Sequence, residues 1–156
     1  MTTQALIGLG SNLGERETHL TRAWEMLGET LDVVPLRISR FYETEPVLLS
    51  PDEVQPMYLN AVGLLETKLH ATELLWAMQV IEEKFGRVRT RRWEARTIDL
   101  DLLLFGDLIV QSEVLTVPHL RMTERLFVLE PAAEIAPDML HPITKKTISQ
   151  LLSARR

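Results

Sequence analysis

The hydrophobic pattern divides the chain into strand-like and helix-like segments. Apolar residues that are continuous, or that alternate with polar ones, predict four strands, over residues 4–10, 34–42, 58–68 and 98–105. Apolar residues at helical spacing predict two helices, over 15–30 and 72–86. Read in order, these segments form β-α-β-β-α-β, the ferredoxin-like pattern of a four-stranded antiparallel sheet backed by two helices. The predicted fold class is therefore α+β.

Glycine, proline and capping residues mark the element boundaries. The run Gly-Leu-Gly-Ser-Asn-Leu-Gly at 8–14 lacks both the Lys-Ser/Thr of a P-loop and the spacing of a dinucleotide fingerprint. We interpret it as a tight turn with a helix cap at Ser11 or Asn12. Thr72 is expected to cap the second helix. Residues 44–56 contain three prolines and predict a long loop of the kind that often covers a binding site.

Further elements are expected after the sheet. Gly-Asp at 106–107 predicts a hairpin turn that leads from the last strand into 108–110. A short helix is expected over 123–129, with its end near Pro131, and a last helix begins at Thr147.

The composition, 46% apolar and 25% charged, is typical of a globular domain. At 156 residues the chain is predicted to form one domain over 1–156. No apolar stretch approaches the roughly 20 residues that cross a bilayer, and the sequence does not open on a basic region followed by an apolar core. We therefore expect a cytoplasmic protein without a membrane partner. The absence of cysteine excludes disulfide scaffolds, thiolate metal sites and cysteine nucleophiles.

One basic cluster stands out in a chain whose net charge is −5. Between residues 87 and 96 lie five arginines and one acid, Glu94. The arginines are Arg87, Arg89, Arg91, Arg92 and Arg96. Guanidinium groups bind phosphate oxygens in bidentate fashion, so the cluster indicates a local polyanion site. A solvated loop or an RNA-binding patch is the alternative, but the low aromatic content, 6%, disfavours RNA and we expect no nucleic-acid partner.

Two aspartates follow the arginine cluster in a strand. Residues two apart in a strand share a face, so Asp99 and Asp101 project together while Ile98, Leu100 and Leu102 face the other way. Carboxylates without histidine or cysteine nearby suit Mg²⁺, which takes one or two of them together with substrate phosphates. A solvated strand face with two acids is the simpler alternative. Carboxylates, a metal and arginines together are what phosphoryl transfer requires.

Aromatic and amide side chains suggest a site for a flat heterocycle. Tyr58 and Asn60 share a face of one strand, and Phe127 lies in the C-terminal part. Stacking would give affinity and hydrogen bonds would give orientation, although ordinary core aromatics are the alternative. His119 either binds a nucleotide or satisfies a loop, and the other three histidines are expected at the surface.

Six motifs stand in an order that is typical of one enzyme family and cover nearly the whole chain. They are Gly-Leu-Gly-Ser-Asn-Leu-Gly at 8–14, Phe-Tyr-Glu-Thr-Glu-Pro at 41–46, Tyr-Leu-Asn-Ala at 58–61, Gly-Arg-Val-Arg at 86–89, Arg-Trp-Glu-Ala-Arg-Thr-Ile-Asp-Leu-Asp-Leu-Leu at 92–103 and Leu-Thr-Val-Pro-His at 115–119. Together they resemble the 6-hydroxymethyl-7,8-dihydropterin pyrophosphokinases of folate biosynthesis.

The resemblance implies transfer of a pyrophosphoryl group from ATP to the pterin hydroxymethyl oxygen, with release of AMP and with two Mg²⁺ ions. Asp99 and Asp101 match the metal ligands. Positions that match ATP contacts are Gln79, Glu82, Arg87, Arg89, Arg92, Leu102, Thr116, His119 and Arg125. Positions that match the pterin site are Thr44, Pro46, Val47, Tyr58, Asn60, Trp93 and Phe127. Arg87, Arg92 and Arg96 match the catalytic arginines.

Three departures from the family pattern are present. Glu94-Ala95 replaces the usual Gly-Pro, Leu120 replaces a frequent tyrosine, and Val114 stands where some members have arginine. The rival hypotheses are a ferredoxin-like RNA-binding or regulatory module that uses the arginine loop, and a nucleotidyl transferase with the same carboxylate pair. AMP as the nucleotide product separates the pyrophosphokinase from both. For the oligomeric state we expect a monomer, with a weak dimer as the alternative.

Overall fold

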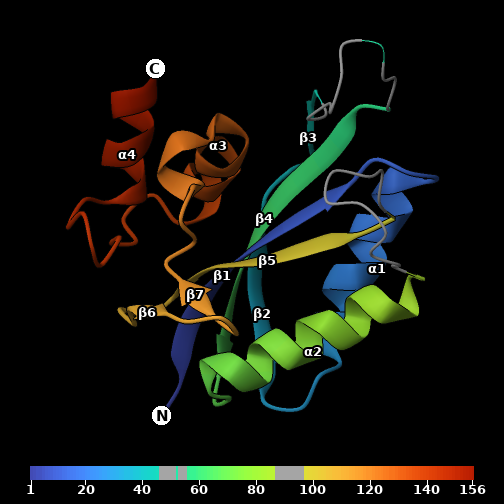
Figure 1. Cartoon of the computed structure of the whole chain (residues 1–156), viewed down its shortest axis with the longest axis horizontal. Coiled ribbons are helices and arrows are strands. Elements are labelled where there is room, and N and C mark those ends of the chain that lie inside the picture. The colour runs from blue at the N-terminus through green and yellow to red at the C-terminus, as the bar shows by residue number, and fades with distance from the viewer. Residues whose placement is uncertain (46–51, 53–55, 87–96) are drawn as a thin grey trace.

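The computed structural model describes residues 1–45, 52, 56–86 and 97–156 (Figure 1). Its elements in chain order are β1 (Thr3–Ser11), α1 (Arg16–Gly28), β2 (Val33–Ile38), β3 (Tyr42–Thr44), β4 (Tyr58–Thr67), α2 (Ala71–Lys84), β5 (Asp99–Phe105), β6 (Val110–Gln111), β7 (Thr116–Val117), the 3₁₀ turn η1 (Met122–Glu124), α3 (Leu126–Ile135) and α4 (Ile148–Arg155). In this part of the chain no helix has the length and apolar character needed to span a bilayer.

The main sheet has the strand order β2-β4-β1-β5, and the short strand β3 also pairs with β4. Every pairing is antiparallel. α1 connects β1 to β2 and α2 connects β4 to β5, and in each case one strand lies between the two that the helix joins. Both helices lie on the same side of the sheet, and α3 and α4 lie on the other (Figure 1). The predicted α+β class is thus confirmed, with β3 as an addition.

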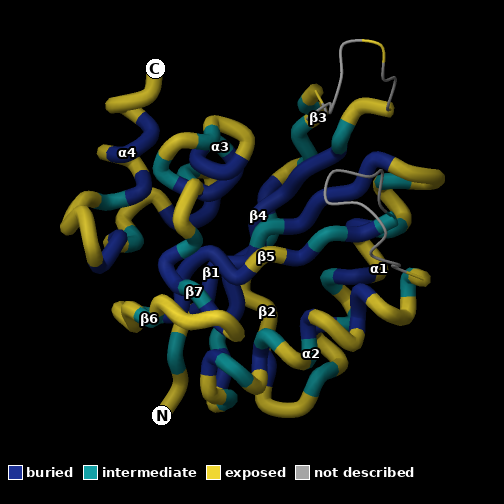
Figure 2. The backbone as a smooth tube through the Cα atoms, in the orientation of Figure 1, coloured by how far each residue is buried: buried dark blue, intermediate teal, exposed yellow. Residues whose placement is uncertain are grey.

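The central strand β1 is buried on both faces of the sheet (Figure 2). Ala5, Ile7 and Leu9 pack in the core beneath α1 and α2. Leu6 faces the opposite way, into a second core formed with the C-terminal helices. That second core also holds Val62 of β4, so α3 and α4 cover the second face at the Leu6 and Val62 level.

The predicted strand over 34–42 is wrong in its extent and its buried face. It is interrupted after Ile38, and β3 begins at Tyr42. Alternation predicts inward side chains at Val34 and Leu36, but these are 51% and 39% exposed. β2 lies at the edge of the sheet, and its pairing with β4 shifts register after Pro35, which breaks the alternation.

The helix boundaries differ from the predicted caps. α1 begins after Glu15, and no side chain caps it. α2 begins after His70, not at Thr72. The Glu73 carboxylate accepts a hydrogen bond from the His70 N–H at 2.8 Å, which gives the helix end a partner that the sequence reading missed.

The C-terminal elements extend further than predicted. α3 continues through Pro131 to Ile135, because its apolar side packs in the second core and offsets the hydrogen bond that proline cannot donate. The turn at 106–107 does not form a hairpin with β5, since β6 pairs with β7. His141, expected at the surface, is buried, and its Nδ1 accepts hydrogen bonds from two backbone N–H groups.

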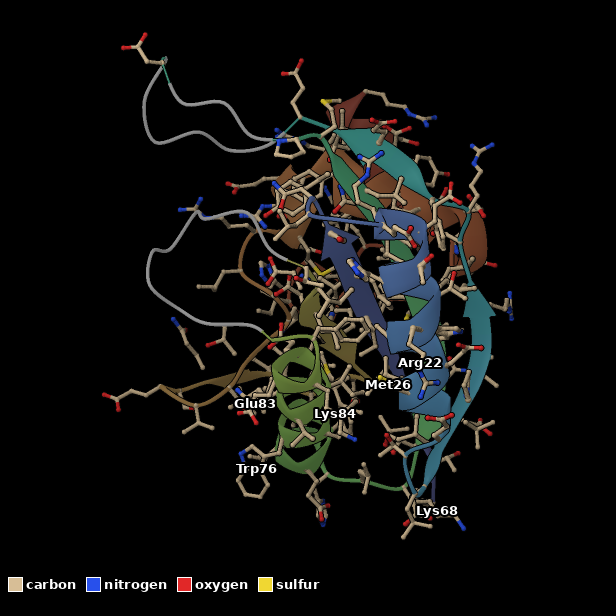
Figure 3. All side chains as sticks on the ribbon, turned by 90° about the vertical axis from the view of Figure 1, so that its right-hand side faces the viewer. Arg22, Met26, Lys68, Trp76, Glu83 and Lys84 are labelled. Carbon is tan, nitrogen blue, oxygen red and sulfur yellow. The ribbon has the colours of Figure 1, made fainter. Side chains whose placement is uncertain are left out.

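The outer side of the helix layer is polar along α1 and mixed along α2 (Figure 3). Arg22 of α1 pairs with Glu25 at 3.8 Å and with Glu29 at 3.2 Å. Trp76 points away from α2 and is 56% exposed. Neither Arg22 nor Trp76 lines the cleft described next, to which α2 contributes Gln79 and Glu82.

Candidate active site

The candidate site lies on the second face of the sheet, beside α3 and η1. Its floor is the part of this face where β1 carries Gly8 and Gly10. A cleft of about 850 Å³ opens above it. Gly10 pairs with Asn60 of β4 on one side and with Asp99 of β5 on the other. Gly8 pairs with Asp101 of β5. These two glycines lie within β1, as the predicted strand over 4–10 has them and not in the predicted turn at 8–14, and they give the cleft a floor without side chains.

Asp99 and Asp101 project from β5 into this cleft. Asp99 is half-buried and Asp101 is exposed, whereas Ile98, Leu100 and Leu102 are buried on the other face, as the alternation predicts. Among the described residues no group of three or more potential metal ligands occurs. Two carboxylates leave most coordination positions to water and phosphate oxygens, so the donor set fits Mg²⁺.

Glu82 holds β5 in place from α2. Its side chain is buried, at 6% exposure, and its Oε2 accepts a hydrogen bond from the Leu100 N–H at 2.9 Å. Leu100 lies between the two aspartates, and β5 is an end strand of the sheet. Glu82 thus satisfies a backbone donor on the side of β5 that faces α2 and fixes the segment that carries both carboxylates.

His119 and two arginines line the cleft beyond Asp101. The Arg121 N–H donates to His119 Nδ1 at 3.2 Å, which leaves Nε2 to carry the proton of a neutral ring. Burial lowers the pKa of His119 below 6.5, and Arg125 and Arg121 lower it further, while Asp101 opposes them. His119 is therefore a neutral donor near pH 7.

Aromatic residues line the cleft from two different elements. Tyr58 comes from β4 and Phe127 from the first turn of α3. The Arg125 guanidinium lies 5.4 Å from the Phe127 ring centroid, a cation–π contact. Asn60 is buried beside Tyr58, and its Nδ2 donates to Thr44 Oγ1.

A polar contact anchors α3 to the strand that carries Thr44. The Tyr42 hydroxyl donates to Glu134 Oε1 at 2.7 Å, and the Arg40 N–H donates to Glu134 Oε2 at 2.8 Å. Burial, together with the hydrogen bond to Glu134, raises the pKa of Tyr42. These contacts connect β3, the strand that ends at Thr44, to the helix that carries Phe127.

All predicted site residues that the structure describes line this one cleft. They are Thr44, Tyr58, Asn60, Gln79, Glu82, Asp99, Asp101, Leu102, Thr116, His119, Arg125 and Phe127. The others, like most of the predicted loop over 44–56, lie outside the described residues. They are Pro46, Val47, Arg87, Arg89, Arg92, Trp93 and Arg96.

Several residues that line the cleft were not among the predicted site residues. Gly8 and Gly10 were placed at the end of a strand and in a turn but not in a site, and Arg121 was assigned no role. Leu120 and Val114, noted as departures from the family pattern, line the cleft and are 68% and 63% exposed. The signal for the glycines was their spacing of two, which places both on one face of a strand.

Comparison with known proteins assigns the family. The family model of 7,8-dihydro-6-hydroxymethylpterin-pyrophosphokinase (HPPK) matches residues 6–137. The chain belongs to this family. The 2-amino-4-hydroxy-6-hydroxymethyldihydropteridine pyrophosphokinase of Bacillus subtilis is 43% identical over 150 residues, which are 96% of this chain and 88% of the relative. The protein of the same name from Haemophilus influenzae is 44% identical over 138 residues, 88% of this chain and 84% of the relative.

Other relatives carry the HPPK region within a longer chain. The folic acid synthesis protein fol1 of Schizosaccharomyces pombe is 39% identical over 148 residues, and this chain spans 20% of its length. A crystal structure of Plasmodium falciparum HPPK-DHPS with pteroate superposes with a TM-score of 0.73 at 14% identity, covering 99% of this chain and 43% of that one. That likeness supports the fold of the HPPK region.

Proposed function

We propose that this HPPK transfers a pyrophosphoryl group from ATP to the hydroxymethyl oxygen of 6-hydroxymethyl-7,8-dihydropterin and releases AMP, a step of folate biosynthesis. One observation carries the proposal: a single cleft is lined by Tyr58 and Asn60 of β4 and by the carboxylate pair of β5, with β1 between these two strands. Asn60, Gly10 and Asp99 lie side by side across β4, β1 and β5. This arrangement places an acceptor beside the phosphates that it would attack.

The acceptor side of the cleft binds the pterin. Tyr58 and Phe127 offer ring faces for stacking, and the Asn60 amide offers a hydrogen-bonding edge. Thr44 fixes that amide from β3. Pro46, Val47 and Trp93 complete this side in the proposal.

The phosphate side of the cleft binds ATP and Mg²⁺. Asp99 and Asp101 would hold two Mg²⁺ ions, which would neutralise and orient the polyphosphate when bound. The neutral His119 donates from Nε2 to a phosphate oxygen, and Arg125 adds a positive charge beside it. Gln79, Leu102 and Thr116 contact the nucleotide.

The arginine cluster supplies further counter-charge in the proposal. Arg87, Arg92 and Arg96 stabilise the negative charge that develops during transfer, and Arg89 binds the nucleotide. We propose a monomer as the working form. We place the reaction in the cytoplasm, where ATP is abundant.

Product analysis tests the proposal. The protein is incubated with Mg²⁺, ATP and 6-hydroxymethyl-7,8-dihydropterin, and the nucleotides are separated. We expect AMP in equal amount to pterin diphosphate, and none without pterin. Pterin-dependent ADP would indicate transfer of a single phosphoryl group, and released pyrophosphate would indicate a nucleotidyl transferase. Either result would overturn the proposed reaction.

A further inference from the structure

Gly10 occupies the middle of a row that crosses three strands. Asn60 stands on one side of it and Asp99 on the other. Two strand spacings separate the outer members of the row by about 10 Å. In the proposed function, Asn60 binds the pterin at one end of this row and Asp99 binds the metal at the other. The reacting hydroxymethyl arm of the pterin must therefore pass above Gly10.

The backbone at this position does not require glycine. Gly14, Gly86 and Gly106 are the glycines with positive φ among the described residues, and Gly10 is not one of them. The space available for a side chain at this position is what favours glycine. A Cβ built on Gly10 would lie 3.0 Å from Asn60 Oδ1 and 3.7 Å from Tyr58 Cδ1.

Gly8 provides a matched comparison on the same strand and the same face. A Cβ there would lie 3.5 Å from Leu103 Cδ1 and 3.7 Å from the Asp101 Cβ, which are ordinary contacts. A methyl group is therefore accommodated at Gly8, but at Gly10 it pushes the Asn60 amide by a few tenths of an ångström.

The Asn60 amide is held from two sides. Its Nδ2 donates to Thr44 Oγ1 on β3, and its Oδ1 lies over Gly10 on β1. The side chain is buried, so an alternative rotamer would have to displace neighbouring groups. Because Gly10 has no side chain, the Asn60 amide has room to lie across β1.

We propose that Gly10 is a positioning residue for the pterin acceptor. Its lack of a side chain sets the orientation of the Asn60 amide and keeps the floor low between that amide and the aspartates. The inference rests on the proposed function and deepens it, because it assigns the acceptor's alignment to a residue without functional atoms.

Binding measurements on two variants, compared with the wild-type protein, test this role. 6-Hydroxymethylpterin is titrated into each protein saturated with Mg²⁺ and a non-hydrolysable ATP analogue, and the analogue is titrated separately. Gly10→Ala is expected to weaken pterin binding about tenfold or more, and to change analogue binding less than about twofold. Gly8→Ala is expected to change pterin binding less than about twofold. Thermal unfolding of each variant accompanies the titrations.

A double-mutant cycle separates positioning from a general loss of stability. In an Asn60→Ala background the Oδ1 contact is absent, so adding Gly10→Ala is expected to weaken pterin binding less than about twofold more. If Gly10→Ala alone unfolds, the comparison of Asn60→Ala with the double variant replaces the cycle, and a further loss of more than about twofold would overturn the inference. Additive effects in the cycle, or equal effects of Gly10→Ala and Gly8→Ala, would overturn the inference. A wild-type protein that binds the analogue but no pterin would instead overturn the proposed function.

Discussion

Replacement of Glu82 tests how the metal-binding strand is held. The Glu82 carboxylate is buried and accepts the Leu100 N–H at 2.9 Å, between the two aspartates of β5. Glu82→Leu has similar bulk but leaves this donor unpaired, which costs about 1–3 kcal/mol of unfolding free energy. Glu82→Gln keeps an acceptor oxygen, so its cost is expected to stay below about 1 kcal/mol.

Loss of this hydrogen bond should also change how the activity depends on the Mg²⁺ concentration. With Leu100 released, Asp99 and Asp101 lose a fixed geometry, and the Mg²⁺ concentration for half-maximal AMP release should rise about tenfold in Glu82→Leu. Urea unfolding and a Mg²⁺ titration of AMP release, both with Glu82→Gln as the control, measure the two effects. A Glu82→Leu protein with wild-type stability and wild-type Mg²⁺ dependence would refute the reasoning.

Three other changes give separate tests. Asp101→Asn removes one carboxylate charge at an exposed position, so AMP release should fall at least about 10³-fold with little change in urea unfolding; more than a tenth of wild-type activity would contradict the metal assignment. Phe127→Ala should weaken pterin binding by about 1–3 kcal/mol in calorimetry, whereas equal loss of ATP-analogue binding would indicate a structural role. Burial lowers the pKa of His141 below 6.5. The stability that neutral His141 contributes is therefore complete above pH 6.5 and falls as the pH drops toward the folded pKa, by at most about 1.4 kcal/mol per pH unit. His141→Asn should therefore make the melting temperature depend less on pH between pH 7 and 5. Parallel curves for the variant and the wild-type protein would show that another group causes the dependence.

The order of elements and the carboxylate pair could be predicted from the sequence, because both depend on local periodicity. A spacing of two places Asp99 and Asp101 on one strand face wherever the strand lies. The spacing of apolar residues in α1 and α2 likewise fixes the side that each helix buries. The family motifs added candidate residues, and those that the structure describes line the cleft.

Tertiary structure decided what lies beside each residue. A spacing of two can place Gly8 and Gly10 on one strand face, but Gly10 acquires its neighbours only when β4 and β5 pair with β1. Val34 is exposed because β2 is an edge strand with a register shift. Pro131 stays within α3, and His141 is buried, because long-range packing outweighs local preference. Periodicity shows which residues share a face, but only the packing of distant segments determines whether that face is covered or open to a substrate.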